Sequence, residues 1–249
     1  MLRGLEAVKG ESRMTASLPC TAQLIAAREN TLLFLRNLDV TRSDFLRMVS
    51  WLDSYDLSRA ARFTSELSMR RFVACHATLR VILGTCTGVE PGSLEFQYNR
   101  RGKPFLRQTQ GVPEVKFSLA HSDRFAIYAL SRSGEVGVDL ERVVSIAESD
   151  LIALRFFTER ERSTLGKLPG RERREAFFGI WTCKEACLKA YGTGLSGDIS
   201  GFDVSEGARV SGRAFTVGGG PETPRVTLIQ FRPVNGFVAA LAVEGSGQA

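Results

Sequence analysis

The sequence lacks the features that place a chain in a membrane or among exported, disulfide-bonded proteins. No stretch is apolar for long enough to span a bilayer, and the basic residues Arg3 and Lys9 are not followed by the apolar run of a signal peptide. The five cysteines are an odd number and contain no CxxC pair, which indicates neither a disulfide framework nor a zinc site. We therefore expect a soluble, unexported, cytoplasmic protein without a membrane partner.

Several catalytic motifs are missing as well. The sequence has no GxxxxGK[ST] loop, no GxGxxG after a predicted strand, no nucleophile elbow and no HExxH helix. Histidine is scarce, with only His76 and His121. These absences leave no obvious covalent nucleophile in the sequence.

The composition is that of an ordinary globular protein with a modest positive charge. Of the 249 residues, 43% are hydrophobic and 24% are charged, which is enough to bury a core as one domain or as two small ones. The 33 Lys and Arg residues exceed the 27 Asp and Glu residues, and the net charge is +6. Such a charge favours polyanionic ligands or an acidic protein partner.

Hydrophobic periodicity predicts separated helices and strands that are mostly joined as hairpins. In the first half we expect strands at 31–40, 94–98, 115–120 and 125–130, and helices at 43–52 and 58–83. In the second half we expect a strand at 135–142, helices at 158–165 and 171–191, and a hairpin of 226–231 with 237–243. Thr158 and Glu161 form a capping box at the start of one of these helices. The second half repeats the order of the first in outline, and the pattern is typical of an α+β fold.

Two carboxylates lie on one face of the strand predicted at 135–142. Side chains alternate along a strand, so Asp139 and Glu141 project from the face opposite the apolar residues. Like charges side by side repel each other unless a cation or basic neighbours compensate them. Gly137 allows a ligand or another backbone to approach closely. Paired carboxylates suit Mg²⁺, which prefers oxygen ligands and is often bound together with substrate phosphates. The alternative is a solvent-facing strand edge.

The long helix predicted at 171–191 adds a third carboxylate and two lysines. Glu185 and Lys189 are four residues apart and lie on one helix face, with Lys184 next to that face. An ordinary surface ion pair also explains Glu185 and Lys189. Lys184 lies beside the apolar stripe, where a purely solvating lysine is less expected. Together with the paired carboxylates, these residues suggest phosphoryl transfer at a site that positions phosphates with Mg²⁺ and lysines.

Three further basic residues are His121, Lys103 and His76. Each of the first two has a structural and a functional interpretation, and the third has a structural one. His121 ends a strand in a His-Ser-Asp corner, where it is either a packed residue or part of a functional loop. Lys103, between Gly102 and Pro104, is either a solvated turn residue or a ligand contact. His76, inside the basic helical stretch, is expected to be structural.

Four segments, taken in order, resemble the Sfp-type 4′-phosphopantetheinyl transferases. They are Arg101-Gly102-Lys103-Pro104, Phe117 to Ser122, Gly137 to Glu141, and Trp181 to Lys189 followed by Gly192-Thr193-Gly194-Leu195. The resemblance implies an α+β fold of two similar halves related by a pseudo-twofold axis, with the active site between them. We accordingly divide the chain into an N-terminal half, 1–135, on the coenzyme A nucleotide-binding side, and a C-terminal half, 136–249, with the metal ligands, the catalytic helix and the terminal hairpin.

The resemblance also implies a reaction and a cofactor. The family transfers the 4′-phosphopantetheine arm of coenzyme A to a serine of an acyl or peptidyl carrier protein and releases adenosine 3′,5′-bisphosphate. Asp139, Glu141 and Glu185 would hold Mg²⁺ against the pyrophosphate of coenzyme A. Glu185, or a water beside it, would be the base for the carrier serine. Lys189 would contact the pyrophosphate, with Lys184 as a second candidate.

At the other end of coenzyme A, the resemblance assigns Lys103 and His121 to the nucleotide and Arg59 to its 3′-phosphate. Arg62 and Arg71 would assist, because guanidinium groups suit bidentate phosphate recognition. Position 120 carries Ala where the family usually has Ser, so one hydroxyl contact is missing.

The expected protein partners are acidic carrier proteins, which a positively charged chain attracts. The apolar part of the docking surface is expected around Phe156, Phe157 and Leu165. Members of this two-half type usually act as monomers, so we expect a monomer and no nucleic-acid partner.

Other functions stay open as alternatives. A basic module for nucleic acid or another polyanion would use the arginines of the helical stretch and show steep salt dependence, with no role for Asp139. A Mg²⁺-dependent phosphohydrolase would turn over coenzyme A with water and no protein acceptor. A third alternative is a family member that binds coenzyme A without transferring its arm.

Overall fold

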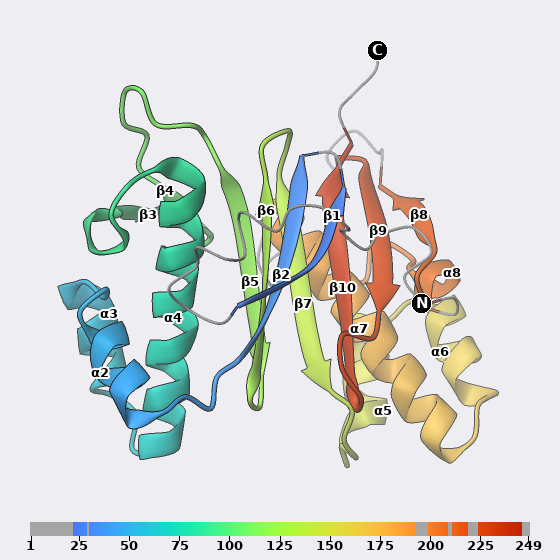
Figure 1. The fold of residues 1–249 in the computed structure, drawn as a ribbon. Helices are drawn as coiled ribbons and strands as arrows, with labels where there is room; N and C mark the ends of the chain where they lie inside the picture. The colour runs from blue at the N-terminus through green and yellow to red at the C-terminus, as the bar shows by residue number, and fades with distance from the viewer. Residues whose placement is uncertain (1–21, 29, 193–198, 209–210, 219–223, 246–249) are drawn as a thin grey trace.

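The computed structural model describes residues 22–245 except 29, 193–198, 209–210 and 219–223 (Figure 1). The strands of the N-terminal half are β1 (Gln23–Arg28), β2 (Thr31–Asn37), β3 (Phe96–Tyr98), β4 (Pro104–Leu106), β5 (Lys116–Ser122) and β6 (Phe125–Ser131). Its helices are α2 (Arg42–Val49), α3 (Ser54–Ala60), α4 (Glu66–Thr87) and the short 3₁₀ helix η1 (Pro91–Ser93).

The C-terminal half begins with the carboxylate strand. Its strands are β7 (Val136–Arg142), β8 (Ala214–Val217), β9 (Val226–Phe231) and β10 (Phe237–Glu244). Its helices are α5 (Ser149–Phe156), α6 (Glu159–Gly166), α7 (Gly170–Tyr191) and α8 (Ser205–Ala208). No helix in the described part of the chain combines the length and the apolar character that crossing a membrane requires.

The two halves share one plan. The strands of the first sheet lie in the order β1-β2-β6-β5 and those of the second in the order β7-β10-β9-β8, and neighbouring strands in both are antiparallel. In each half a strand (β2 or β7) leads through three α-helices, and then a further short helix (η1 or α8), to a hairpin (β5–β6 or β9–β10) that pairs with it. The third helices, α4 and α7, are both 22 residues long. The predicted α+β fold of two similar halves is thereby confirmed.

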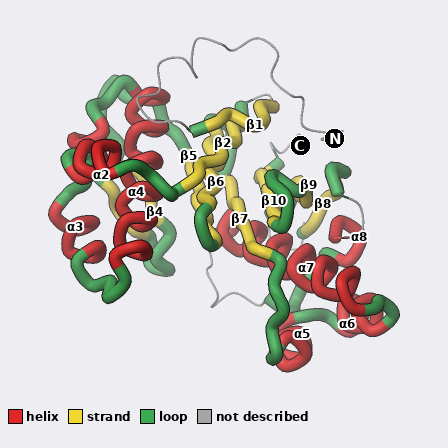
Figure 2. Tube along the Cα trace, turned by 60° about the horizontal axis from the view of Figure 1, so that its bottom comes forward, coloured by secondary structure: helices red, strands yellow, loops and turns green. Residues whose placement is uncertain are grey.

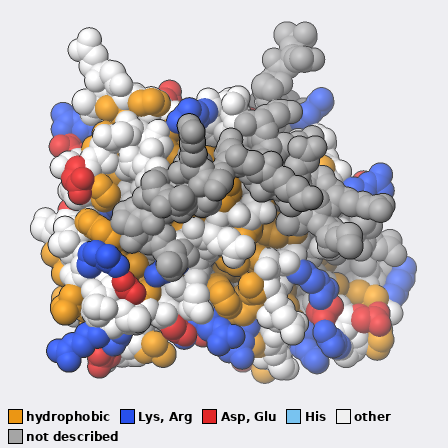
Figure 3. Space-filling view, viewed as in Figure 1, with side chains coloured by type: hydrophobic (Ala, Val, Ile, Leu, Met, Phe, Trp, Pro, Cys, Tyr) orange, Lys and Arg blue, Asp and Glu red, His pale blue; other side chains and the backbone are white. Residues whose placement is uncertain are grey.

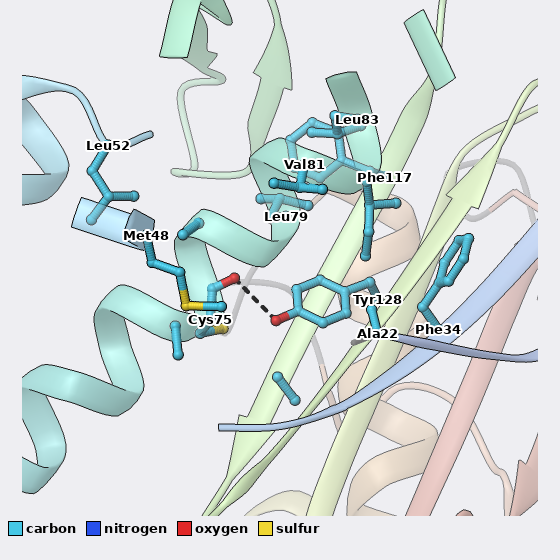
Figure 4. Close-up of a cluster of buried hydrophobic side chains, with 14 of the residues drawn as sticks. Ala22, Phe34, Met48, Leu52, Cys75, Leu79, Val81, Leu83, Phe117 and Tyr128 are labelled. Atoms are coloured by element: carbon cyan, nitrogen blue, oxygen red, sulfur yellow. Dashed lines mark hydrogen bonds between the residues drawn. The ribbon is translucent and has the colours of Figure 1, made fainter. Parts of the chain in front are cut away.

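Helices cover the outer faces of the sheets. In the N-terminal core the hydroxyl of Tyr128, on β6, donates to the backbone carbonyl of Cys75 in α4 at 3.0 Å (Figure 4). The inner faces of the two sheets share a third apolar cluster, which includes Ile127 of β6 and Leu140 of β7. Figures 1 and 2 accordingly show α2–α4 on one side of the molecule, α5–α7 on the other, and the sheets between them.

Two serine hydroxyls join the sheets where β5 lies beside β7. The Ser118 hydroxyl accepts a hydrogen bond from the backbone N–H of Val138 at 3.1 Å, and the Ser122 hydroxyl accepts one from Arg142 at 3.0 Å. Side chains on β5 therefore satisfy backbone donors of β7, and this seam fixes the carboxylate strand against the N-terminal half.

The helix predicted at 58–83 is wrong, because the chain breaks there into α3 and α4. The Ser65 hydroxyl accepts a hydrogen bond from the backbone of Ser68 at 3.3 Å and caps the start of α4. Sequence analysis also missed β1, β4, α5, α8 and β8, which are all short. The capping box of Thr158 and Glu161 and the terminal hairpin are confirmed, and the helix predicted at 171–191 is α7, which begins one residue earlier.

Candidate active site

A cleft of about 740 Å³ runs from the N-terminal helices to the carboxylate strand. One end is aromatic and basic and is formed by α3, α4 and β3. The other end reaches β7 and α7. The lining residues are Tyr55, Asp56, Arg59, Phe63, Phe72, His76, Leu79, Phe96, Tyr98, Gly102, Pro104, Leu119, Ala120, His121, Asp139 and Lys189.

Gly137 allows α7 to lie directly against β7. A Cβ atom at this position would lie 2.0 Å from the carbonyl oxygen of Ala186 and 2.4 Å from the backbone nitrogen of Ala190. The close approach that the sequence predicted is thus made by a helix backbone. It brings the face of α7 that carries Lys189 alongside Asp139.

Asp139 is buried beneath Lys189. The Lys189 ammonium donates to Oδ1 of Asp139 at 2.7 Å and to the carbonyl oxygen of Val138 at 3.1 Å. Oδ2 of Asp139 is buried and has no hydrogen-bond partner within the described part of the chain. Burial raises the pKa of Asp139, although Lys189 acts in the opposite direction. A buried carboxylate oxygen without a partner is rare and is a natural position for a cation.

Glu141 and Glu185 share the electrostatic environment of Asp139. Burial and then the charge of Asp139 raise the pKa of Glu141 to about 7, while the Ser122 hydroxyl donates to its Oε2 at 2.9 Å. Burial and the charge of Asp139 also raise the pKa of Glu185. Lys189 alone therefore does not offset the three negative charges, and a divalent cation would stabilise their ionised forms.

No three His, Cys, Asp or Glu side chains of the described residues converge closely enough to form a metal cage. Mg²⁺ does not require such a cage, because it usually keeps several waters and takes one or two carboxylates plus substrate phosphates. The unpartnered oxygen of Asp139 and the raised pKa values of Glu141 and Glu185 fit such a partly open site.

Lys184 lies elsewhere, and the phosphate contact predicted for it is corrected. Its ammonium is completely buried, 3.0 Å from Oε2 of Glu161, and donates to the carbonyl oxygens of Ile199 and Phe202. These partners come from α6 and from the segment before α8. Lys184 faces away from the cleft and joins α7 to its neighbours.

Two predicted phosphate-binding arginines do not line the cleft either. Arg71 binds both carboxylate oxygens of Asp39 at 2.8 and 3.3 Å and also Asp123 at 2.8 Å. Arg62 is exposed in the turn after α3. Arg71 therefore braces the N-terminal half, which argues against the assisting role predicted for it. The assisting role of Arg62 stays a prediction.

Lys103 lies at the edge of the cleft and binds protein groups. Its ammonium donates to Glu135 at 2.6 Å, to the carbonyl oxygen of Val136 at 3.2 Å and to that of Ala190 at 3.4 Å. The residues on either side of Lys103 line the cleft, but Lys103 itself ties the β3–β4 turn to β7 and α7.

Arg59 and His121 line the cleft, and their contacts with the nucleotide stay predictions. Burial, followed by the charges of His76 and Lys189, lowers the pKa of His121. Sequence analysis missed His76 as a cleft residue. Its position four residues after Phe72 and four before Arg80 on α4 was the available signal, because residues at this spacing share a helix face.

Comparison with known proteins identifies the family. Residues 135–242 match the 4′-phosphopantetheinyl transferase superfamily, and residues 37–133 match the 4′-phosphopantetheinyl transferase N-terminal domain. The chain is 35% identical to the 4′-phosphopantetheinyl transferase HetI of Nostoc sp., over 84% of this chain and 86% of HetI. It is 27% identical to the 4′-phosphopantetheinyl transferase Sfp of Bacillus subtilis, over 64% of this chain and 68% of Sfp.

A fungal relative extends the comparison. The chain is 40% identical to the L-aminoadipate-semialdehyde dehydrogenase-phosphopantetheinyl transferase of Eremothecium gossypii, over 67% of this chain and 66% of that protein. The order of the family matches follows the two halves of the fold, and the similarity to HetI extends over most of both proteins. The chain therefore belongs to the 4′-phosphopantetheinyl transferase superfamily, among its Sfp-type members.

Proposed function

We propose that the protein transfers the 4′-phosphopantetheine group of coenzyme A to a serine of an acyl or peptidyl carrier protein, with Mg²⁺ as cofactor and adenosine 3′,5′-bisphosphate as the second product. The continuity of the cleft carries this proposal. The cleft extends from aromatic and basic groups around Arg59 to Asp139 and Lys189. A substrate that joins a nucleotide to a pyrophosphate uses both environments.

The nucleotide would bind at the aromatic end, within residues 1–135. Tyr55, Phe72 and Tyr98 offer ring faces for a purine. Arg59 and His121 supply donors for a phosphate, and Arg59 already stacks over Phe72 at 5.0 Å. Lys103 would act on the nucleotide only by holding the β3–β4 turn in place.

The metal would bind at the other end, within residues 136–249. Asp139 would supply its unpartnered Oδ2, and Glu141 and Glu185 are the further carboxylates. When bound, Mg²⁺ would neutralise the charge of the pyrophosphate and of the leaving nucleotide. Lys189 would add a second positive charge beside the same phosphates.

Glu185 is the proposed base. The carrier serine oxygen forms a bond to the phosphorus that bears the pantetheine arm, and the bond from this phosphorus to the bridging pyrophosphate oxygen breaks. The serine proton passes to the carboxylate of Glu185. Burial and the charge of Asp139 raise the pKa of Glu185, which strengthens its affinity for this proton. Adenosine 3′,5′-bisphosphate leaves as an anion.

The carrier would dock on α5, although not through all the residues first predicted. Phe157 and Leu165 belong to the C-terminal core, and Phe156 packs partly buried against Trp181. The exposed apolar surface of α5 is formed by Leu151 and Leu154, which are 66% and 65% exposed. Their spacing of three places them on one helix face.

The polyanion-binding alternative loses its main support. Arg70 donates to the carbonyl oxygen of Val40 at 2.8 Å, and Arg71 is bound to two aspartates. These arginines are engaged within the N-terminal half and do not form a free basic stripe.

Intact-mass spectrometry tests the proposal. An apo acyl carrier protein and an apo peptidyl carrier domain are each incubated with the protein, coenzyme A and Mg²⁺. The expected result is a mass gain of one phosphopantetheine arm, about 340 Da, that requires Mg²⁺ and disappears with Asp139→Ala. Coenzyme A turnover without carrier modification would instead support the phosphohydrolase, and no reaction with either carrier would contradict the transfer.

A further inference from the structure

His76 reaches the cleft from α4 with one ring nitrogen already engaged. Its ring stacks on Phe72 at a centroid distance of 4.1 Å and an interplanar angle of 30°. Its Nδ1 lies 3.2 Å from Oδ1 of Asp56. Both partners also line the cleft. Packing on one face and a carboxylate at one nitrogen together fix the orientation of the imidazole.

Asp56 is itself held by a buried arginine. Asp56 is almost completely buried, and Oδ2 accepts hydrogen bonds from Nε and a terminal nitrogen of Arg80 at 3.3 Å each. The fully buried Arg80 also donates to the carbonyl oxygens of Pro91 and Leu94 at 3.2 and 2.9 Å and pairs with Asp53. Arg80 thus fixes Asp56, whose second oxygen is left to orient His76.

The other nitrogen of His76, Nε2, has no hydrogen bond to any described residue. With Nδ1 donating to the Asp56 carboxylate, Nε2 is an acceptor in the neutral ring and a donor in the imidazolium. The imidazolium is the form that would donate to a phosphate in the cleft. A packing role for His76 would require only the ring. The contacts from Arg80 to Asp56 and from Asp56 to His76 also fix the orientation of the imidazole ring. Such a fixed orientation is typical of a group that contacts a ligand.

Two other basic residues line the same cleft, Arg59 and His121. The Arg59 guanidinium lies 5.0 Å from the centre of the Phe72 ring on which His76 stacks. His121 is near enough to His76 for the two charges to interact. Lys189 and Asp139 mark the opposite end. A ligand with a pyrophosphate at Lys189 and a separate phosphate monoester at Arg59 matches this distribution, and coenzyme A carries both groups.

We propose that His76, oriented by Asp56, binds the 3′-phosphate of coenzyme A and makes the enzyme discriminate between coenzyme A and its 3′-dephospho form. The inference rests on the proposed function for the identity of the substrate. It adds a specificity-determining residue, His76, and two positioning residues, Asp56 and Arg80.

Calorimetric binding of two nucleotides tests the proposal without turnover. Adenosine 3′,5′-bisphosphate and adenosine 5′-monophosphate differ only in the 3′-phosphate. His76→Phe keeps a ring over Phe72 but removes Nε2. The preference for the bisphosphate is expected to fall about 10- to 100-fold in this variant, as for a lost charge-assisted hydrogen bond, while affinity for the monophosphate changes less than about threefold.

A matched pair of aspartate variants tests the positioning role. Asp53 and Asp56 both pair with Arg80, but only Asp56 contacts His76. Asp56→Asn is expected to reduce the preference for the bisphosphate, and Asp53→Asn is expected to retain it. Thermal unfolding of all three variants identifies any that fail to fold, and kcat/KM with coenzyme A and 3′-dephospho-coenzyme A gives the same ratio independently.

The outcomes separate this inference from the proposed function. An unchanged preference in His76→Phe, or equal weakening of both nucleotides, would overturn the role of His76 even if the wild type modifies carriers. A lost preference in His76→Phe would support it even if the wild type binds the bisphosphate and transfers nothing.

Discussion

Ser122 makes two hydrogen bonds across the seam, and one of them reaches a proposed metal ligand. Its hydroxyl donates to Oε2 of Glu141 at 2.9 Å and accepts from the backbone of Arg142 at 3.0 Å. Partners of this kind orient a carboxylate before the metal arrives, and removing one typically lowers metal affinity about 10- to 100-fold. We predict that Ser122→Ala weakens Mn²⁺ binding, measured by electron paramagnetic resonance, by about tenfold.

Ser118→Ala is the matched control for this prediction. Ser118 accepts from the backbone of Val138 in the same seam but contacts no carboxylate. Both variants are expected to lower Tm by similar amounts, and only Ser122→Ala should change the metal affinity. Ser122→Thr should restore it, since the hydroxyl is kept. Equal metal affinity in the two alanine variants would mean that Ser122 serves the seam alone.

At the scale of residues, sequence spacing was enough to place some residues at the candidate site and not others. Strand alternation was sufficient to place Asp139 and Glu141 on one face. Lys184 and Lys189 are both lysines on one helix, and which of them reaches the cleft depends on their partners. Glu161, brought in by α6, binds Lys184, whereas Asp139 binds Lys189.

At the scale of elements, the contact between α7 and β7 sets the position of the proposed catalytic residues Asp139, Glu185 and Lys189. Gly137→Ala would place a methyl group 2.0 Å from the Ala186 carbonyl oxygen. The backbones of β7 and α7 would have to move apart to relieve this clash. We predict a destabilisation of about 3 kcal/mol, since overpacking of this kind falls at the upper end of the usual range. Thermal unfolding should show a Tm lower by roughly 6 to 12 °C.

Gly166→Ala is the control for this substitution. Gly166 ends α6, and a Cβ atom there would meet no other atom within 4 Å. Its Tm should change by no more than about 2 °C, because surface changes usually stay within about 0.5 kcal/mol. A Gly137→Ala variant as stable as Gly166→Ala would show that α7 does not rest on β7 as described.

Helix α5 exposes two leucines that the C-terminal core does not use. The double variant Leu151→Gln, Leu154→Gln should raise the KM for a carrier protein about tenfold, because it removes apolar surface that docking would bury. The KM for coenzyme A and the Tm should stay unchanged. Leu46→Gln, on α2 in the other half, is a matched control with a side chain that is 63% exposed. An unchanged carrier KM would exclude α5 as the docking element.

For the whole molecule, the shared apolar cluster makes the two halves depend on each other. Phe125 of the first sheet and Phe237 of the second pack edge to face at 5.1 Å. Figure 3 shows basic, acidic and apolar side chains interspersed over the coloured part of one face of the molecule. Separation would expose the inner faces of both sheets, so we expect them to unfold together.

The two tryptophans report on this cooperativity, one in each half. Trp51 follows α2 and Trp181 lies on α7. In Trp51→Phe and in Trp181→Phe, the urea midpoint from fluorescence should coincide with the midpoint from circular dichroism of the same variant. Two separated midpoints in either variant would show that one half survives without the other.

The sequence by itself determined the features that depend on neighbours along the chain. Thr158 and Glu161 specify a helix start through bonds within one turn, and the apolar stripe of 170–191 with Gly192 specifies the long helix and its end. Alternation specified the carboxylate strand, and the ordered motifs specified the family. The long helix predicted at 58–83 failed because the Ser65 cap outweighs a periodicity that continues across the break.

Only the tertiary structure decided which of the charged residues face the cleft. Arg59 and Arg71 are equally basic in sequence, but Asp39 and Asp123 bind Arg71 from distant segments, whereas Arg59 stays in the cleft. His76 has a structural role on its own helix and becomes a cleft residue because Asp56 of α3 orients it. The role of a charged side chain in a folded protein depends on the group that pairs with it. The partners of Arg71 and His76 are 20 to more than 50 residues away in the sequence.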